Sequence, residues 1–230
     1  MTPERFDIYD DQQNWIGTSL RSEVHAKGYW HRSFHCWIVR DEGEQRRVLF
    51  QRRRDIKDTF PGCYDITAAG HLTAGEQLQD ASRELEEELG VYTPFEALTY
   101  LLTATQQLQG EVRGVPFIDR EFSAVYGLCL NQRLEAYVLQ PSEVDSLYEV
   151  PLDDLLALFR NEIDVIQATG VQTQPLTSPP HSIGHKDPLS DHAADEPERI
   201  VREIRATEFV PHGTAYYTDV LEALYHVPKE

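Results

Sequence analysis

Short apolar runs, some alternating with polar residues, predict a sheet in the first part of the chain. The segments 33–40 and 47–52 have this pattern, and the turn-forming stretch Asp41–Glu44 separates them, so we expect two neighbouring strands. Residues 6–17 predict an earlier hairpin, because two partly apolar ends flank a polar turn. Further strands are expected within 65–69, 97–105, 117–130 and 146–150.

Three other segments have apolar residues at the spacing of an amphipathic helix. Residues 77–89 are expected to form the first helix, ended by Gly90 as a C-terminal cap. A proline in the first turn, followed by leucines at helical spacing, predicts a second helix over 151–159. Residues 215–225 predict a third. Strands before and after a central helix favour an α+β fold, a sandwich with a mixed sheet.

The segment 169–198 has a different composition, rich in Pro, Ser, Thr and His. We expect a long surface loop or flexible insertion there, within one main domain that spans residues 1–230. The segment contains His181, His185 and His192. A tract of histidines can bind metal, but the surrounding Pro and Ser favour a solvated loop.

Composition restricts the function. Asp and Glu outnumber Lys and Arg by 39 to 21, and the net charge of −18 argues against general nucleic-acid binding. No apolar run is long enough to span a bilayer, and the first residues do not resemble a signal peptide. Three widely spaced cysteines fit free thiols, so we expect a cytoplasmic protein. Positive charge is concentrated in one place: Arg46, Arg47, Arg52, Arg53, Arg54 and Lys57.

The predicted helix 77–89 has an unusual concentration of acidic residues. Residues three and four apart share one face of a helix, so Glu84, Glu87 and Glu88 point the same way. Three carboxylates on one stripe repel each other unless a cation lies between them. Because Mg²⁺ prefers oxygen ligands, the pattern predicts a metal site. A solvated acidic surface is the alternative.

The residues around this helix resemble the Nudix box, G-x5-E-x7-R-E-U-x-E-E-x-G-U, where U is aliphatic. Gly70, Glu76 and the run Arg83–Val91 match the motif, except that six residues instead of seven separate Glu76 from Arg83. The resemblance implies an α/β/α Nudix sandwich with a central mixed sheet. It also implies a hydrolase that cleaves a diphosphate linkage with Mg²⁺, for which Mn²⁺ is a substitute. Its substrate would be a nucleoside diphosphate derivative or another small organic diphosphate.

Most of the chain outside 169–198 is similar to the Nudix branch related to isopentenyl-diphosphate isomerase. The segments 25–35, 52–71 and 209–217 carry this likeness. In the isomerases a catalytic Cys precedes the Gly-His pair, and here Ala69 stands at that position. Alanine exchanges no proton, so we expect hydrolysis instead of isomerisation. An isomerase and a non-catalytic ligand-binding Nudix domain remain the alternatives.

The resemblance assigns the metal ligands to the box. These are Glu84, Glu87 and Glu88, with the backbone carbonyl of Gly70 as a possible fourth ligand. Glu87 and Glu88 are therefore catalytic residues in this interpretation. Glu121 is the candidate general base, since Asp119 and Glu121 match a pair of acidic ligands in the isomerases and face the same side of a strand. Arg83 and Glu76 are expected to orient the box glutamates.

Substrate contacts are expected from basic and imidazole side chains. Arg53 and Lys57 match basic positions of the related group and are the expected diphosphate contacts; a solvated basic turn is the alternative. His71 is expected near the site. His25 and His31 match regions that hold metal-ligating histidines in the isomerases, and imidazole prefers Mn, Fe or Zn to Mg. A homodimer is the commonest assembly and is left open.

Overall fold

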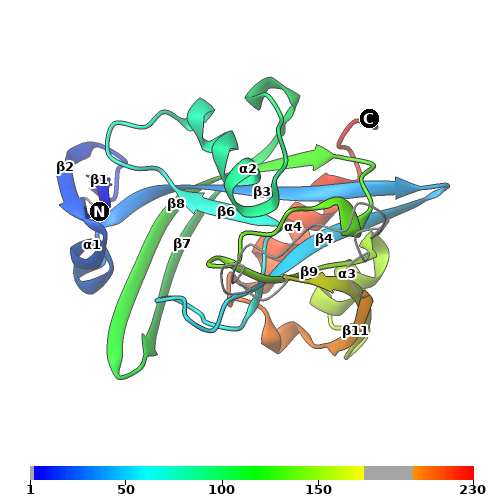
Figure 1. Cartoon of the computed structure of the whole chain (residues 1–230). Helices are drawn as coiled ribbons and strands as arrows, with labels where there is room; N and C mark the ends of the chain where they lie inside the picture. The colour runs from blue at the N-terminus through cyan, green and yellow to red at the C-terminus, as the bar shows by residue number, and fades with distance from the viewer. Residues whose placement is uncertain (1–2, 174–198) are drawn as a thin grey trace, which may run out of the picture.

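A computed structural model describes residues 3–173 and 199–230 (Figure 1). The strands are β1 (Arg5–Tyr9), β2 (Trp15–Leu20), β3 (Trp30–Glu42), β4 (Gln45–Arg53), β5 (Tyr64–Asp65), β6 (Ala68–His71), β7 (Thr99–Val112), β8 (Val115–Cys129), β9 (Val144–Pro151), β10 (Ile166–Gln172) and β11 (Arg199–Ile204). The α-helices are α1 (Arg21–Lys27), α2 (Arg83–Leu89), α3 (Leu152–Phe159) and α4 (Thr214–Leu224). The short 3₁₀ helices are η1 (Leu78–Ser82), η2 (Phe95–Ala97), η3 (Leu134–Ala136) and η4 (Ala206–Glu208).

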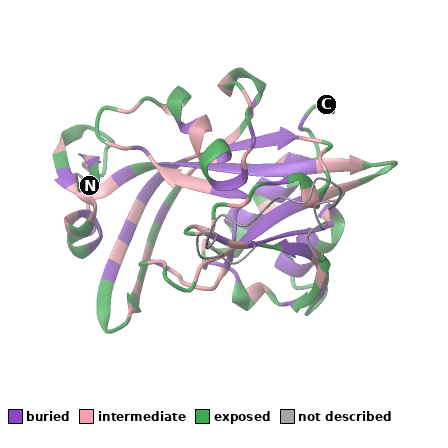
Figure 2. Ribbon diagram, viewed as in Figure 1, coloured by how far each residue is buried: buried purple, intermediate pink, exposed green. Residues whose placement is uncertain are grey.

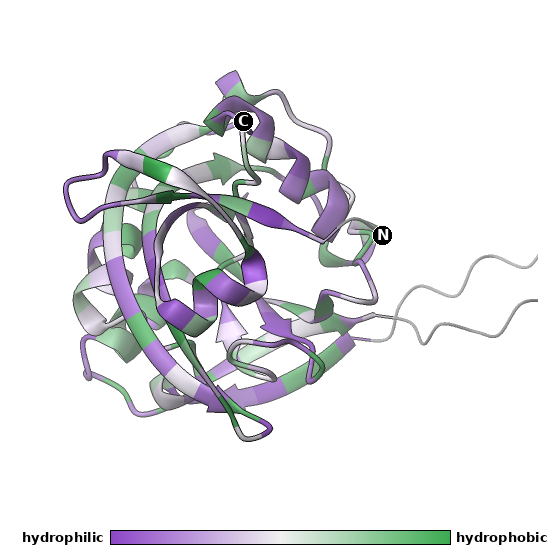
Figure 3. Cartoon of the chain, turned by 90° about the vertical axis from the view of Figure 1, so that its left-hand side faces the viewer, coloured by the Kyte–Doolittle hydropathy of each residue, from purple (hydrophilic) through white to green (hydrophobic). Residues whose placement is uncertain are grey.

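The described strands form one mixed sheet in the order β11-β10-β9-β4-β3-β1-β2. The parallel partner of β3 is β8, from Trp30 opposite Arg120 to Val39 opposite Cys129, and β7 pairs antiparallel with β8. β6 pairs with β3 and β5 pairs with β4. Viewed from the side, the long strands curve around the centre of the molecule (Figure 3). The expected hairpins at 6–17 and 33–52 are confirmed as β1–β2 and β3–β4.

Strand β3 supplies both sides of the core, because successive side chains of a strand point to opposite faces. Phe34 and Ile38 belong to a buried cluster with Leu85 of α2. Trp37 belongs to a second buried cluster with residues of α3 and α4, including Tyr217. Buried residues therefore line the middle of the sheet, and exposed ones follow its edges and tips (Figure 2). The expected α+β sandwich with a mixed central sheet is confirmed.

Two expected boundaries are corrected. The predicted helix 77–89 is divided: η1 precedes α2, which begins only at Arg83 and ends at Gly90 with a φ of 69°. Part of the predicted loop 169–198 is wrong, because residues 169–172 belong to β10: all four pair with β9, and 169–171 also pair with β11. The remainder of that loop, from 174 to 198, lies outside the described residues. Within residues 3–173 and 199–230, no helix is long and apolar enough to cross a membrane.

Candidate active site

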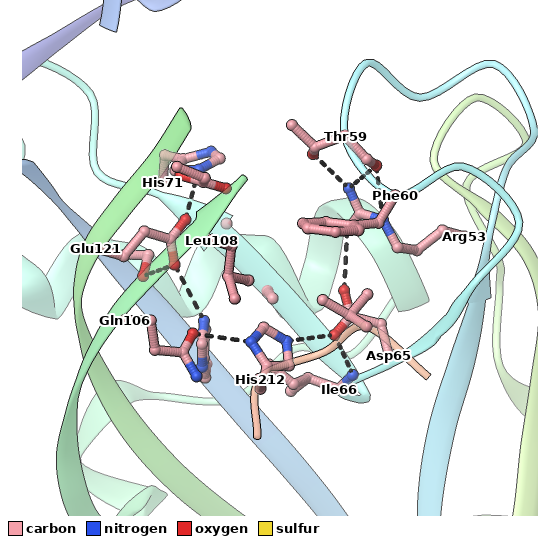
Figure 4. Close-up of a pocket in the computed structure, with 16 residues that line it drawn as sticks. Arg53, Thr59, Phe60, Asp65, Ile66, His71, Gln106, Leu108, Glu121 and His212 are labelled. Atoms are coloured by element: carbon pink, nitrogen blue, oxygen red, sulfur yellow. Dashed lines mark hydrogen bonds and ion pairs between the residues drawn. The ribbon is translucent and has the colours of Figure 1, made fainter. Parts of the chain in front are cut away.

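Two adjoining cavities lie beside β6. The larger, of about 760 Å³, is lined by the glutamates of α2 and by basic residues of the β4–β5 connection. The smaller, of about 50 Å³, is lined by residues of β5, β7, β8 and the segment before α4. The two cavities share Arg53, Ala69, Gly70 and His71. We call the larger one the box cavity and the smaller one the inner pocket (Figure 4).

Helix α2 turns its acidic stripe toward the box cavity because its leucines face the core. Leu85 and Leu89 are fully buried, and Glu84, Glu87 and Glu88 line the cavity. The connection that is one residue short forms η1, whose 3₁₀ geometry advances further along the axis per residue than an α-helix does. This explains how a shorter box still reaches the start of α2.

Arg83 binds the acidic residues of the box together. Its guanidinium donates to Glu76 over 2.7 and 3.0 Å, to Glu84 over 2.7 Å and to Glu87 over 3.1 Å. Glu76 in turn accepts from the backbone N–H of Thr73 over 2.7 Å. The geometry agrees with the orienting role expected of Arg83 and Glu76.

Glu88 of α2 is buried and Glu84 is half-buried, and neither has a full set of partners. Glu88 is 5% exposed and accepts from Gln51 Nε2 over 3.0 Å and from the Ala69 N–H over 3.3 Å. Burial, together with the charge of Glu84, raises the pKa of Glu88 to about 8. Burial also raises the pKa of Glu84 to about 7, against the lowering effect of Arg83. Carboxylates held this way need a cation to be ionised together, so the donor set fits a divalent metal.

Gly70 lies directly against this cluster. A Cβ added at Gly70 would lie 2.1 Å from the Cδ and Oε1 atoms of Glu84, far closer than any real contact. Only glycine therefore allows the β6 backbone to approach the Glu84 carboxylate this closely. Glu87 is different, because 58% of its side chain is exposed and its described partner is Arg83. The metal-binding roles of Glu84, Glu87, Glu88 and Gly70 stay predictions.

A second cluster of possible metal ligands lies on the other side of His71. His25, His31, His71 and Asp119 each bring one ligand atom within 4.8 Å of all the others, the one such group in the described part of the chain. The Nε2 atoms of His25 and His31 lie 3.8 and 3.5 Å from Asp119 Oδ1. These three atoms are buried and have no hydrogen-bond partner. Their arrangement fits a metal with imidazole and carboxylate ligands.

The four residues of this cluster come from four elements. Helix α1 is only seven residues long, and Gly28 at its end allows it to pack closely on β8: a Cβ at Gly28 would lie 2.6 Å from Ile118 Cγ2. This close packing brings His25 of α1 to Asp119 of β8. His31 and His71 come from β3 and β6, which are hydrogen-bonded neighbours.

The imidazoles of this cluster are in the state that binds metals. Burial lowers the pKa of His25 to about 4, that of His71 to about 3, and that of His31 below its usual value. All three rings are therefore neutral at pH 7 and keep a lone pair for a cation. Burial and the charge of Glu121 raise the pKa of Asp119. A bound cation would favour the ionised carboxylate of Asp119 and so counteract the cost of burying its charge.

Glu121 lies between the cluster of three histidines and Asp119 and the inner pocket, which it lines. Its Oε1 lies 2.9 Å from His71 Nε2, and its Oε2 accepts from the Ser33 hydroxyl over 2.8 Å. Burial alone would raise the pKa of Glu121, but the imidazoles of His35 and His71 hold it well below its usual range. Glu121 is thus an ionised carboxylate in the site, as a base must be; its role stays a prediction.

The two expected substrate-binding cations line the box cavity but have partners already. Arg53 donates to Asp65 Oδ2 and to the Thr59 carbonyl, both over 3.0 Å. Lys57 pairs with Glu143. A diphosphate would compete with these acceptors for both cations. Their substrate contacts therefore remain predictions.

Sequence reasoning missed several residues of the site. Arg21 of α1 lies 3.4 Å from His71 Nδ1 and pairs with Glu4 and Asp58, and nothing in the sequence pattern pointed to it. Gln106 and His212 line the inner pocket. The likeness of the segment 209–217 to the isomerase branch was a usable signal for His212, but it gave the residue no role.

The chain is similar to several known proteins. Residues 29–168 match the NUDIX domain model. A protein named as an uncharacterised Nudix hydrolase, from Clostridium acetobutylicum, is 36% identical over 224 residues, which cover 97% of this chain and 98% of that relative. An isopentenyl-diphosphate Delta-isomerase of Mycolicibacterium vanbaalenii is 42% identical over 92 residues, covering 39% of this chain and 49% of the relative. The solved structure of DR0079 from Deinococcus radiodurans aligns with a TM-score of 0.49 at 21% identity, covering 69% and 90% of the two chains.

Proposed function

The chain belongs to the Nudix family and is a hydrolase of pyrophosphate bonds, and from this premise we propose that it cleaves a small organic diphosphate with the help of Mg²⁺. The observation that carries the proposal is the box cavity. There the carboxylates of half-buried Glu84 and buried Glu88 line the same space as the cationic side chains of Arg53 and Lys57. A metal–diphosphate complex presents cations to the glutamates and anionic oxygens to the two basic residues.

The metal would be held by Glu84, Glu87 and Glu88, with the Gly70 carbonyl beside them. A divalent cation bound there neutralises the diphosphate and makes a coordinated water more acidic. Arg83 bridges Glu76, Glu84 and Glu87 and holds them in place before substrate arrives. Mg²⁺ suits this all-oxygen site, whereas the imidazole-rich cluster of His25, His31, His71 and Asp119 suits Mn²⁺ or another transition metal.

The protein side chains divide the remaining work. Arg53 and Lys57 bind and orient the diphosphate oxygens, which brings the scissile bond next to the glutamates. Glu121, fixed by Ser33 and His71, accepts a proton from the attacking water.

Isomerisation of isopentenyl diphosphate is the second candidate function. The imidazole–carboxylate cluster favours it, because its members match the metal-binding regions of the isomerases, and isomerases are among the relatives. Ala69 argues against it: the residue lines both cavities at the position of the isomerases' catalytic Cys and has no group that can carry a proton.

One assay separates the candidates. A panel of organic diphosphates, with isopentenyl diphosphate included, is incubated with the protein and Mg²⁺ or Mn²⁺; phosphate release and double-bond migration are both followed by NMR. Hydrolysis that is lost in Glu88→Gln but kept in Glu86→Gln supports the proposal, since Glu86 lies exposed on the same helix. Double-bond migration alone would support the isomerase, and turnover of no diphosphate would support a binding domain without catalysis.

A further inference from the structure

Three side chains form a hydrogen-bonded row along one wall of the inner pocket. Asp65 Oδ1 lies 3.0 Å from His212 Nε2, and His212 Nδ1 lies 2.8 Å from the Gln106 side-chain oxygen. Asp65 is fixed in turn by Arg53 and by the Ile66 N–H. Figure 4 shows the row running across the pocket, with the side chains of Phe60 and Leu108 nearby. The row joins three distant parts of the chain, β5, β7 and the segment before α4.

The last member of the row has an unused polar atom. Gln106 is 7% exposed, lines the pocket, and its Nε2 is buried without a hydrogen-bond partner. Rotating the amide by half a turn does not remove the problem, because Oε1 would then be the atom without a partner. In the orientation that the structure shows, the Gln106 side-chain oxygen faces His212 Nδ1. The Gln106 N–H group is then the free donor.

Beside polar side chains such as Ser33, His35 and Arg53, the pocket has an apolar wall. Phe60, Ile66, Leu108 and Val210 line this wall. Phe60 has a φ of 43°, a strained conformation for a bulky residue, and its ring packs edge-on against Phe117 at 5.1 Å. The pocket therefore combines an apolar wall with polar groups, and the Gln106 N–H group is the buried donor in its described lining that has no partner.

We propose that Gln106, positioned by His212 and Asp65, makes the enzyme select organic diphosphates whose non-phosphate part carries a hydrogen-bond-accepting oxygen. This inference rests on the proposed function, which places the diphosphate in the box cavity. The organic part then enters the inner pocket past Ala69 and Gly70, which line both cavities. A purely hydrocarbon group that enters this pocket of about 50 Å³ leaves the buried Gln106 donor unpaired. Sites of this kind discriminate strongly against analogues that lack the polar group.

The test uses substrates that differ in one atom. Hexyl diphosphate is compared with its ether isosteres, in which an oxygen replaces one methylene at the third, fourth or fifth position of the chain. We expect at least one ether to exceed hexyl diphosphate about tenfold in kcat/KM, the effect of one well-formed buried hydrogen bond. In Gln106→Met, which keeps the volume and removes the donor, this ratio falls to about 1. Gln107→Met changes an exposed neighbour on β7 and keeps the ratio.

His212→Leu tests whether His212 positions Gln106, and the quantity measured is again the ratio of kcat/KM for the ether and hexyl diphosphates. Loss of the ether preference, without an equal loss of hexyl diphosphate turnover, separates positioning from general damage. A wild-type enzyme that hydrolyses both substrates equally, or an ether preference that survives Gln106→Met, overturns the inference and leaves the proposed hydrolase intact. If nothing is hydrolysed, the proposed function fails. Calorimetric binding of the same ligands in the presence of Mg²⁺ then decides the inference by itself: equal affinities for ether and hydrocarbon overturn it.

Discussion

Replacing Gly70 by alanine separates the position of the Glu84 carboxylate from the stability of the fold. The added Cβ would lie 2.1 Å from Glu84 Oε1, and ordinary van der Waals contact begins near 3.4 Å, so the carboxylate must move by about 1.3 Å. A displacement of about 1 Å in a catalytic group lowers the rate roughly 100-fold. We therefore expect kcat/KM of Gly70→Ala to fall by about two orders of magnitude in the Mg²⁺-dependent assay.

The fold should tolerate the same substitution. The atoms that clash belong to the end of a long side chain, which can rotate away, and the backbone of Gly70 does not need positive φ. We expect the melting temperature to change by less than about 4 °C, which corresponds to about 1 kcal/mol for a chain of this size. Circular dichroism and calorimetry of the metal-free protein measure this.

Gly43→Ala is the matched control. Gly43 has a φ of 64° in the turn between β3 and β4, and a Cβ there meets no atom within 4 Å. This variant should lose about 1 kcal/mol of stability through backbone strain and keep its activity. The reasoning is refuted if Gly70→Ala retains activity within threefold of wild type, or if it loses activity only because it unfolds.

Three further predictions concern stability, acid sensitivity and metal binding. Thr67→Val removes a buried hydroxyl that bridges a β3 amide and a β4 carbonyl; urea unfolding should show a loss of about 2–4 kcal/mol. Burial alone would raise the pKa of Asp65, but the His212 hydrogen bond lowers it to about 2. The ionised carboxylate therefore stabilises the folded protein above about pH 4, and this contribution is lost as the pH falls toward 2. Asp65→Asn should therefore be roughly 2 kcal/mol less stable at pH 7, with the difference shrinking in acid; a pH-independent difference contradicts this. His31→Ala should abolish the rise in melting temperature that Mn²⁺ gives the wild type, whereas the exposed His226→Ala should keep it.

The sequence predicted those features of the fold that depend on local periodicity. The β3–β4 hairpin, the acidic face of α2 and the cap at Gly90 each follow from residues close together in the chain. Helix α1 was missed because seven residues give too few periods, and only Val24 and His25 of it are buried. The parallel pairing of β3 with β8 was not predicted, since no local pattern encodes the register of strands so far apart.

In the candidate site, too, the residues that are close in the sequence were predicted and the long-range contacts were not. The half on α2 was predicted, because one helical stripe brings its carboxylates together. The imidazole cluster was anticipated only through family resemblance, since four elements contribute one ligand each. The Gln106–His212–Asp65 row depends on the tertiary placement of the segment before α4, and the polar residues of that segment have no pattern of their own.

The way in which β5 pairs with the segment before α4 has a consequence for biosynthesis. Tyr64 forms a parallel bridge to Phe209, so contacts that complete the pocket join residues far apart in the chain. Closing such long loops is entropically unfavourable and slows folding. At about 5–20 residues per second, a ribosome takes roughly 4–17 s to extend the chain from the end of β8 to His212. During that interval the residues of the acidic helix have been synthesised, but the segment that completes the wall for the organic part of the substrate has not. The growing chain is thus unable to recognise substrate until translation has passed His212.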